Sequence, residues 1–443
     1  MKRIVVLGAG FVVKPAVDYF LDRCGYEVVV TSRQRSKAER IVEGRPSGRA
    51  VVWSIEQRDK LDRLVAESDL VLSMISPSLH LSVAEACLRH RKTLVTTSYM
   101  SPAMEALEER CREADILILK EIGEDPGMDN MTVKRLIDRA KAEGGEVEAV
   151  TSYGAGLPAF EHNNNPFGYK FSWSPIGLVL AAQTPAAYLV EGRKVEVPAR
   201  ELFDHHWLVD LDGVGSFETY PNRDSTVYLD CLELGREVSL FRGILRYIGW
   251  CNTMRSVADL QLLDVARKRS FRSQTCAQFM ATLIGEPDTA GILEKTARFL
   301  NIASNSDQMK RLQWLGLFSD KRIETAEGTN GDLLVELMTG KMSYAPFERD
   351  MVILYGDITV AFPDRKEKRS ATLVAKGEPN GDTAMSKAVS IPAAIASRLI
   401  LEGKIGAKGV RRPLSQEIYR PVLEEMETFG FRFADKTVKI EKS

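Results

Sequence analysis

The first part of the chain alternates short apolar runs with stretches in which apolar positions recur every three or four residues. Residues 3–7 read Arg-Ile-Val-Val-Leu, a nearly continuous apolar run typical of a parallel strand covered on both faces. The same patterns predict further strands at residues 27–33, 49–53, 70–75, 93–97 and 116–119, and helices over residues 11–24, 55–67, 79–90 and 104–114. This alternation predicts an α/β fold with a doubly wound parallel sheet.

A glycine turn directly follows the first strand. Gly8 lets the chain turn sharply, and Gly10 lets the backbone approach a pyrophosphate at the positive end of the next helix. Val13 stands at the third glycine position of this fingerprint, where a smaller residue would allow closer packing of helix on strand. Residues 1–125 are therefore predicted to form a dinucleotide-binding Rossmann domain, with the ligand at the carboxyl ends of the strands.

The end of the second strand indicates which dinucleotide is bound. An NAD site usually has Asp or Glu here to hold the ribose 2′-hydroxyl, whereas this chain has Ser32 and Arg33. A hydroxyl and a guanidinium suit a 2′-phosphate, which a carboxylate would repel. The predicted cofactor is NADP.

From about residue 126 the strand and helix rhythm changes. A strand is expected at residues 147–153, followed by a tight loop at residues 154–158. Downstream, the patterns predict a mostly helical insertion at about 243–345, a hairpin of strands 352–362 and 368–375, and helices over 383–403 and 415–429. We expect residues 126–382 to form an α+β domain for substrate binding and dimerisation, and residues 383–443 to pack back on the first domain.

Composition narrows the possible partners. Sixty basic and 61 acidic residues leave a formal charge of −1, so no basic field favours nucleic acid or an anionic membrane. No apolar run approaches the roughly 20 residues that cross a bilayer.

The six cysteines form no CxxC pair, so we expect buried thiols. The five histidines show no metal-ligand spacing, so we expect no metal site. The first residues lead straight into a strand, so we expect a cytoplasmic protein.

Two arginine-bearing segments of the second domain are candidates for anion recognition. The turn-rich run at residues 220–225 would present Arg223, and the run at residues 242–247 carries Arg242 and Arg246. Arginines on rigid loops suit bidentate capture of carboxylates. Surface ion pairing is the alternative for each of them.

Several segments resemble the saccharopine dehydrogenase family, especially its glutamate-forming saccharopine reductases. They lie at residues 8–12, 97–102, 121–129, 156–158, 165–174, 220–225 and 242–247. The resemblance extends over essentially the whole chain. It implies a hydride transfer in lysine metabolism, in which glutamate and 2-aminoadipate 6-semialdehyde condense to an imine that NADPH reduces to saccharopine. It also implies a homodimer.

The resemblance further implies which residues bind the ligands. The substrate contacts would be Ser98, Tyr99, Asp125, Arg223, Ile244, Leu245 and Arg246. The dinucleotide contacts would be Gly8, Gly10, Phe11, Val12, Ser32, Arg33, Trp53, Ser54, Ile75, Asp125 and Ser174. Three carboxylates on saccharopine call for fixed cations such as Arg223 and Arg246.

The chain departs from the family pattern at two positions. It has Gly154 where many members have Cys, and Ile244 where Thr is common. No catalytic residue is assigned, although Asp125 and Tyr99 are candidates for proton transfer. Two alternatives stay open: a related imine reductase such as a carboxynorspermidine dehydrogenase, and a noncatalytic NADP-binding protein.

Overall fold

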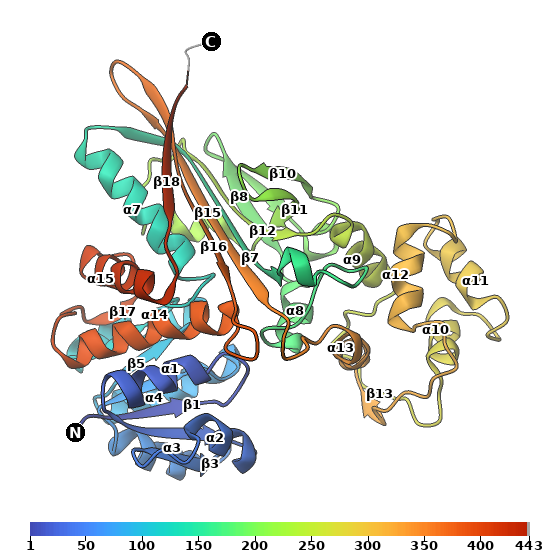
Figure 1. The fold of residues 1–443 in the computed structure, drawn as a ribbon, viewed down its shortest axis with the longest axis horizontal. Helices are drawn as coiled ribbons and strands as arrows, with labels where there is room; N and C mark the ends of the chain where they lie inside the picture. The colour runs from blue at the N-terminus through green and yellow to red at the C-terminus, as the bar shows by residue number, and fades with distance from the viewer. Residues whose placement is uncertain (441–443) are drawn as a thin grey trace. The chain divides into compact units, whose positions relative to one another are not determined.

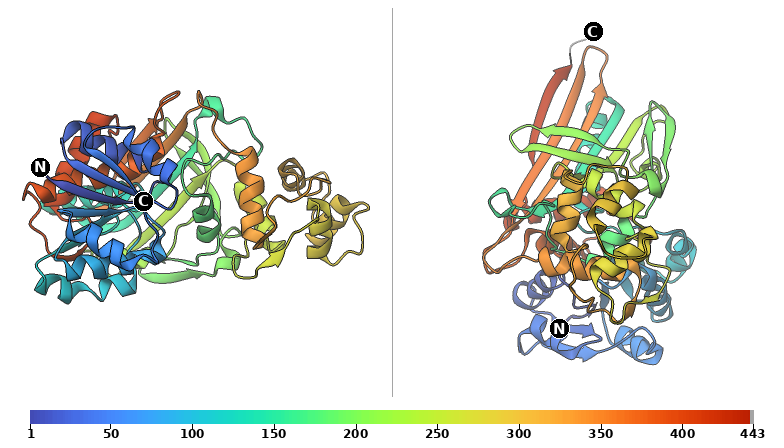
Figure 2. Two further views of the ribbon diagram at one scale, coloured as in Figure 1. Left: turned by 90° about the horizontal axis from the view of Figure 1, so that it is seen from below. Right: turned by 90° about the vertical axis from the view of Figure 1, so that its right-hand side faces the viewer.

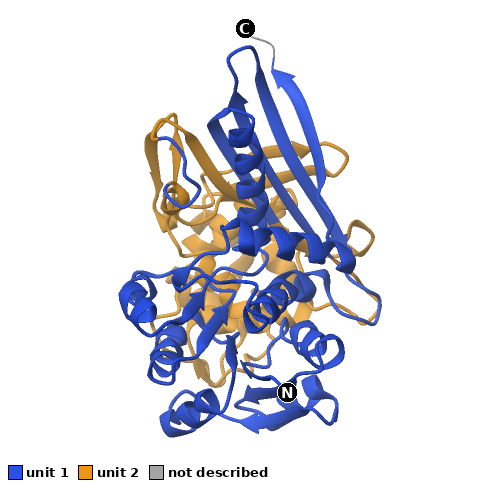
Figure 3. Ribbon diagram, turned by 90° about the vertical axis from the view of Figure 1, so that its left-hand side faces the viewer, with its two compact units in different colours: residues 1–154, 230–235, 351–443 blue, residues 155–229, 236–350 orange. Residues whose placement is uncertain are grey.

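The computed structural model describes residues 1–440 and divides into two compact units (Figure 3). Unit 1 contains residues 1–154, 230–235 and those from 351 onward, and unit 2 contains residues 155–229 and 236–350. This division assigns residues 126–154 and 351–382 to the unit of the first domain, which differs from the boundaries expected above. The domain boundaries themselves stay a prediction.

Unit 1 contains the parallel sheet expected from the sequence. Its seven strands lie in the order β17-β6-β5-β4-β1-β2-β3. They are β1 (Arg3–Leu7), β2 (Glu27–Ser32), β3 (Gly48–Val52), β4 (Leu70–Ser73), β5 (Thr93–Thr96), β6 (Leu117–Leu119) and β17 (Gly409–Arg411). All neighbouring strands are parallel. The prediction of a doubly wound parallel sheet is confirmed, whereas β17 was not expected because three residues show no periodicity.

Helices connect these strands. They are α1 (Lys14–Asp18), which continues as the π-helix η1 (Tyr19–Arg23), α2 (Arg35–Val42), α3 (Arg58–Ala66), η2 (Pro77–Leu79), α4 (His80–Arg89), α5 (Pro102–Glu105) and α6 (Glu108–Glu113). The single helix expected over residues 104–114 is wrong, because the Leu107 N–H bonds to the Met104 carbonyl and separates α5 from α6. Helix α2 was not predicted, since its sequence is mostly charged.

The C-terminal part of unit 1 packs on this domain. Its helices are α14 (Ala384–Leu401) and α15 (Gln416–Met426) with η6 (Glu427–Phe429), and α14 lies beside α1 (Figure 1). The Tyr19 hydroxyl donates to Glu425 at 2.6 Å and accepts from Arg398 at 2.7 Å. These bonds connect the first helix of the chain to its last two.

Helix α14 is the one helix within residues 1–440 long and apolar enough to cross a membrane. No such segment was expected from the sequence. In the structure 72% of the helix is buried inside the protein, which is how the core helix of a globular unit behaves. The length and composition of α14 are therefore weak evidence that it crosses a membrane.

An antiparallel hairpin and helix α7 complete unit 1. Helix α7 (Met128–Ala142) packs against β16 (Lys366–Lys376), which pairs with β15 (Asp350–Ala361) and with β18 (Ala434–Ile440). The predicted hairpin is confirmed. Strand β18 lies beyond the last predicted helix and was not expected, because its residues are all exposed and give no apolar pattern.

Strand β7 (Glu146–Pro158) is longer than expected. The tight loop predicted at residues 154–158 is wrong, because these residues continue the strand. Ala155 and Leu157 are buried, with exposed fractions of 3% and 0%. Packing of these residues outweighs the turn preference of the Gly-Ala-Gly-Leu-Pro sequence.

Unit 2 combines antiparallel strands with helices. The strands are β8 (Ala186–Val190), β9 (Arg193–Val197), β10 (Trp207–Leu211), β11 (Gly215–Pro221) and β12 (Ser239–Arg246), with the short pair β13 (Arg269–Ser270) and β14 (Glu327–Gly328). The helices are α8 (Pro175–Ala181), α9 (Trp250–Asp259), α10 (Cys276–Ile284), α11 (Ile292–Phe299), α12 (Asp307–Leu315) and α13 (Asn330–Lys341), with the short turns η3 (Phe160–His162), η4 (Ala199–Glu201) and η5 (Ser225–Tyr228). Helices α10, α11 and α12 pack together (Figure 2). Residues 250–341 are mostly helical, whereas residues 243–246, placed in the predicted helical insertion, belong to β12.

Candidate functional site

The glycine turn after β1 has the geometry of a close-approach site. Gly8 has φ +115°, and a Cβ there would lie 2.8 Å from the Met74 carbonyl oxygen, so a larger residue is excluded. Gly10 has no atom within 4 Å of the place where a Cβ would be, so its backbone faces open space. Phe11 beyond it is 65% exposed and Val12 is half-buried. This open backbone suits the approach of a pyrophosphate.

Ser32 and Arg33 lie where strand β2 ends. The Ser32 hydroxyl accepts a hydrogen bond from the Gln34 N–H at 3.1 Å. Arg33 is exposed and forms no ion pair within the described part of the chain. Its guanidinium is thus available to an external anion, as the 2′-phosphate of NADP requires.

Three further predicted cofactor residues lie at the same sheet edge. The Trp53 N–H donates to the Ser32 carbonyl at 2.9 Å, and its ring is 4% exposed. The Ser54 N–H donates to Gln57 at 3.2 Å. Ile75 follows β4, and its Cγ2 would be 3.5 Å from a Cβ on Gly8. The parallel sheet therefore brings these residues to the edge that carries the glycine turn.

Tyr99 and Asp125 form a direct pair. The Tyr99 hydroxyl donates to the Asp125 carboxylate at 2.7 Å. Gly154 lies against this carboxylate, because a Cβ on Gly154 would be 2.8 Å from Asp125 Oδ2. The absence of a side chain at position 154 thus leaves room for Asp125 in its observed place.

Ser98, the third predicted substrate residue in unit 1, is bonded to a histidine that was not predicted. The His80 Nε2 atom lies 2.9 Å from the Ser98 hydroxyl and 3.1 Å from Thr96 Oγ1, and its Nδ1 lies 3.0 Å from Ser73 Oγ. His80 is 1% exposed. The sequence signal for His80 is a polar residue among the apolar positions of the helix that follows Ser76-Pro77 at the end of a strand.

Lys120 is a second residue that was not predicted. It directly follows β6 and is 1% exposed. Burial lowers the pKa of Lys120 to about 8, with Glu121 opposing this shift and Arg412 reinforcing it. A lysine at the end of an apolar strand, just before the segment at residues 121–129, was visible in the sequence.

Arg246 is the best-defined candidate in unit 2. It is 6% exposed, and its guanidinium lies 5.2 Å from the ring centre of Tyr169 and 5.4 Å from that of Trp250. Its Nη1 donates to the neighbouring Leu245 carbonyl at 2.9 Å, whereas its Nε has no partner. The aromatic rings hold the cation without neutralising it.

Glu218 lies directly opposite Arg246 across strands β11 and β12. Its two oxygens accept from the N–H groups of Gly249 and Cys251 at 2.7 and 2.9 Å, at the beginning of α9. Within residues 1–440, no carboxylate lies within ion-pair distance of Arg246. The surface ion pair considered as an alternative for this arginine is therefore excluded.

The β11–β12 pairing also brings the two predicted arginine segments together. Tyr220 lies opposite Ile244, and Arg223 follows the end of β11 with φ +58°. The Arg223 carbonyl accepts from the Ala187 N–H at 3.0 Å, which holds this turn on β8. Because side chains alternate along a strand, Ile244 and Leu245 lie on opposite faces of β12. Leu245 is fully buried and Ile244 is half-buried.

Ser174, the last predicted cofactor residue, is the N-cap of α8. Its hydroxyl accepts from the Gly177 N–H at 3.2 Å, and the residue is exposed. Its role toward the dinucleotide stays a prediction, as do the roles of the other predicted residues.

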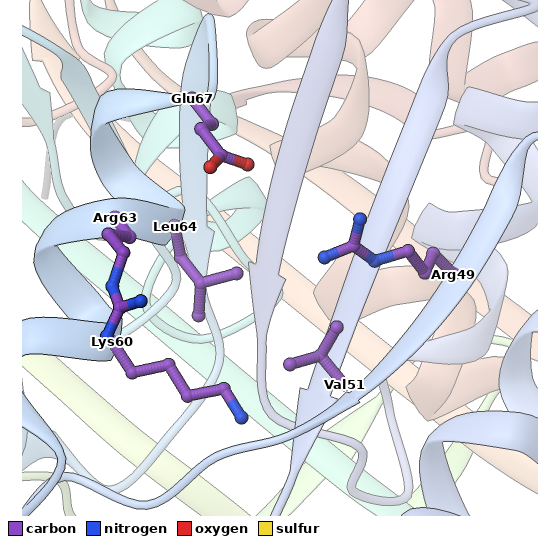
Figure 4. Close-up of a pocket in the computed structure, with 6 residues that line it drawn as sticks. All are labelled: Arg49, Val51, Lys60, Arg63, Leu64 and Glu67. Atoms are coloured by element: carbon purple, nitrogen blue, oxygen red, sulfur yellow. The ribbon is translucent and has the colours of Figure 1, made fainter.

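A hollow of about 350 Å³ lies away from these groups, between β3 and α3 (Figure 4). Its lining combines Arg49 and Val51 of the strand with Lys60, Arg63 and Leu64 of the helix and with Glu67 directly after it. It contains none of the predicted site residues, and we do not assign it to the ligands.

Comparison with known proteins gives a consistent result. The family model described as saccharopine dehydrogenase NADP binding domain matches residues 4–119, and the saccharopine dehydrogenase C-terminal domain matches residues 123–431. The chain is 33% identical over 448 residues to saccharopine dehydrogenase [NADP(+), L-glutamate-forming] of Schizosaccharomyces pombe, covering 99% of both proteins. Its similarity to the apo saccharopine dehydrogenase (L-Glu forming) structure from Saccharomyces cerevisiae has a TM-score of 0.86 at 30% identity, covering 99% of this chain and 100% of that one.

The chain also matches longer proteins. It is 34% identical over 447 residues to the mitochondrial alpha-aminoadipic semialdehyde synthase of Bos taurus, which covers 99% of this chain and 48% of the synthase. The chain thus spans about half the length of these synthases. Together with the glycine turn and the unpaired Arg33, both family models show that the chain belongs to the saccharopine dehydrogenase family, with NADP as its cofactor.

Proposed function

We propose that the protein is an NADP-dependent saccharopine dehydrogenase of the glutamate-forming type. In the reductive direction, the amine of L-glutamate condenses with the aldehyde of 2-aminoadipate 6-semialdehyde, and water leaves to form an imine. Bound NADPH supplies the hydride that reduces the imine carbon, and a proton is added at nitrogen to give saccharopine. The oxidative direction reverses these steps.

The observation that carries this proposal is the buried Arg246 guanidinium, which forms no ion pair with a carboxylate in the part of the chain that the structure describes. A buried charge is costly unless it is paired, so such a cation is best explained by an anionic ligand. The substrate named here carries several carboxylates, and a guanidinium binds each of them with two hydrogen bonds. The identity to glutamate-forming relatives supports the same substrate.

Proton transfer is proposed for the Tyr99–Asp125 pair. The two groups share a hydrogen bond of 2.7 Å, so a proton gained or lost by one is stabilised by the other. Either residue can be the one that faces the substrate nitrogen. Tyr99→Phe and Asp125→Asn are each expected to lower kcat, and Tyr99→Phe is expected to retain NADPH binding.

The proposal is tested by following NADPH oxidation with L-glutamate and 2-aminoadipate 6-semialdehyde. A panel in which diamines replace glutamate runs alongside. Turnover with glutamate supports the proposal. Turnover only with a diamine identifies the related imine reductase, and NADPH binding without turnover of any amine identifies a noncatalytic protein.

Arg246→Ala gives a sharper test of the carboxylate site. The KM for glutamate is expected to rise about tenfold or more, because a charge-assisted hydrogen bond contributes roughly 1.5–3 kcal/mol. The matched control is Arg200→Ala, since the Arg200 side chain is 84% exposed in the same unit. Unchanged kinetics in Arg246→Ala would contradict the assignment.

The cytoplasmic location and the homodimer expected from the sequence are also proposals. Fractionation of cells that express the tagged full-length protein tests the location. The mass of the protein in solution tests the homodimer.

A further inference from the structure

One face of the parallel sheet changes from apolar to polar side chains at the carboxyl ends of its strands, and we call these polar residues the polar layer. On this face, Val71, Leu94 and Ile118 lie side by side in β4, β5 and β6 and belong to the core beneath α4. Because side chains alternate along strands, the residues two positions further along share the face. They are Ser73, Thr96 and Lys120, and they replace the apolar core with hydroxyls and an ammonium at the carboxyl edge.

His80, the first residue of α4, closes this layer. Its ring nitrogens contact the hydroxyls of Ser73, Thr96 and Ser98 at 2.9–3.1 Å. Burial, followed by the charge of Lys120, lowers the pKa of His80 to about 3, so the imidazole is neutral at physiological pH. A neutral ring has one N–H and one lone pair, so it limits the directions in which the bonded hydroxyls can point.

The Lys120 ammonium has no direct bonding partner within residues 1–440. It forms no hydrogen bond or ion pair with any residue the structure describes. The charged or titratable groups that face it are His80 from α4, the adjacent Glu121, and Arg412 beyond β17. The Glu121 carboxylate is already engaged, because its Oε1 accepts from the Met100 N–H at 2.7 Å and from Arg412 at 3.2 Å.

The strand order separates this layer from the phosphate-binding residues. Ser32 and Arg33 follow β2, on one side of β1, whereas the polar layer lies over β4, β5 and β6 on the other side. An anion that meets Lys120 therefore belongs to the substrate rather than to the cofactor's 2′-phosphate. A neutral or cationic ligand would leave the ammonium uncompensated.

We infer that the polar layer is a subsite for one carboxylate of the amino-acid substrate, in which Lys120 supplies the neutralising charge and His80 orients the Ser98 hydroxyl to donate to that carboxylate. The inference rests on the proposed function for the identity of the substrate. Lys120 is then a binding residue, and His80 is a positioning residue that acts through Ser98.

The charge of Lys120 is tested with Lys120→Met and Lys120→Arg. At pH 7 the KM for glutamate is expected to rise about tenfold or more in Lys120→Met and to recover largely in Lys120→Arg, because hydrogen bonds to charged groups contribute this much. The KM for NADPH is expected to change less than about twofold. Equal rises for both ligands, or wild-type kinetics in Lys120→Met, would overturn the inference.

A pH profile separates this role from a structural one. Lys120 loses its charge as the pH rises through about 8, so the wild-type KM for glutamate is expected to rise in that range. Arginine stays protonated, so this rise is expected to disappear in Lys120→Arg, and in Lys120→Met the KM is expected to be high at every pH. The same profile in all three proteins would refute a role for the ammonium.

The coupling of His80 to Ser98 is tested by a double-mutant cycle. If His80 acts through Ser98, the double variant His80→Gln/Ser98→Ala loses no more affinity for glutamate than Ser98→Ala alone. His90→Gln is the matched control, because His90 follows the same helix but bonds to Asp62 at 3.0 Å. Fully additive losses would contradict the positioning role.

Calorimetric titration of dicarboxylates, with NADP present, distinguishes failure of this inference from failure of the proposed function. Binding to the wild type that is lost in Lys120→Met supports the subsite even where glutamate is not turned over. Turnover of glutamate that is unaffected by Lys120→Met disproves the subsite and leaves the proposed function intact.

Discussion

Two arginines of this protein are candidates for ligand binding because they lack the ion pairs that other arginines form. Arg33 is exposed and Arg246 is buried, yet neither forms an ion pair with a carboxylate within residues 1–440. Many other arginines of the chain are paired, as in the contact of Arg411 with Glu108 at 2.8 Å. A cation without a partner is available to a ligand, and this distinguishes candidates for recognition from structural ion pairs.

Arg33→Ala is expected to raise the KM for NADPH about tenfold or more while changing the KM for NADH little, because only NADPH carries the 2′-phosphate. Steady-state kinetics with both dinucleotides measure this. Arg35→Ala is the control, since Arg35 lies nearby in the chain, is 73% exposed and is already paired with Glu39. A parallel loss for NADH would mean that Arg33 supports the fold of the turn instead.

Lys120 is expected to reduce the stability of the fold that holds it. Its pKa is lowered from 10.5 to about 8. Since a tenfold change in proton affinity corresponds to roughly 1.4 kcal/mol, the charged form costs roughly 3 kcal/mol. The unfolded chain binds more protons than the native protein between these two pKa values. Stability therefore rises with pH across this window, and below about pH 8 the cost is fully present.

Lys120→Met is accordingly expected to unfold at higher urea concentration than the wild type at pH 7. The gap is expected to shrink between pH 8 and pH 10, where the wild type loses its charge. Urea unfolding at both pH values, with Lys37→Met as an exposed-lysine control, measures the difference. A less stable Lys120→Met would show that the ammonium has a favourable partner.

At the scale of elements, the first and last parts of the chain depend on each other. Strand β17 extends the parallel sheet at β6, and α14 and α15 are bonded to the first helical segment through Tyr19. Burial, followed by the bond to Glu425, raises the pKa of Tyr19, so its hydroxyl stays protonated and donates. The dinucleotide-binding domain is thus completed by residues almost 400 positions downstream.

Tyr19→Phe removes both hydrogen bonds of this hydroxyl while Arg398 and Glu425 keep their direct contact at 2.6 Å. We expect unfolding to be easier by about 1–2 kcal/mol. Denaturant unfolding measures this, and Tyr26→Phe serves as a control because Tyr26 stacks on Phe20 without such a bonded network. Equal stability of the two variants would contradict the role of the Tyr19 hydroxyl in connecting these elements.

At the scale of the whole molecule, strand β18 presents a sheet edge. Within the described residues it pairs with β16 alone, and all of its residues are exposed. Such an edge readily pairs with another chain, which is one way to form the proposed homodimer. We expect light scattering of the purified protein to give twice the chain mass of 49.4 kDa. A mass that stays at one chain across micromolar concentrations would contradict the dimer.

Local signals predict much of the first domain. Strands β1 to β6 and the glycine turn are evident from the sequence, because continuous apolar runs and a glycine at φ +115° reflect short-range physics. The segments that bear Arg223 and Arg246 are also identifiable without knowledge of their neighbours. The elements that local signals do not reveal are short or charged, as in α2 and β17.

The amino-acid sequence by itself indicated the strands of the parallel sheet, the NADP site and the family, because each is marked by short segments whose residues lie close together in the chain. Tertiary structure alone decided that β17 extends the parallel sheet, that residues 154–158 form a strand, and that His80 bonds to Ser98 and lies near Lys120. These features join residues far apart in sequence, and burial rather than local preference selects them. Tertiary structure also decided that Arg246 forms no ion pair within residues 1–440, because the facing Glu218 carboxylate accepts from N–H groups at the beginning of α9.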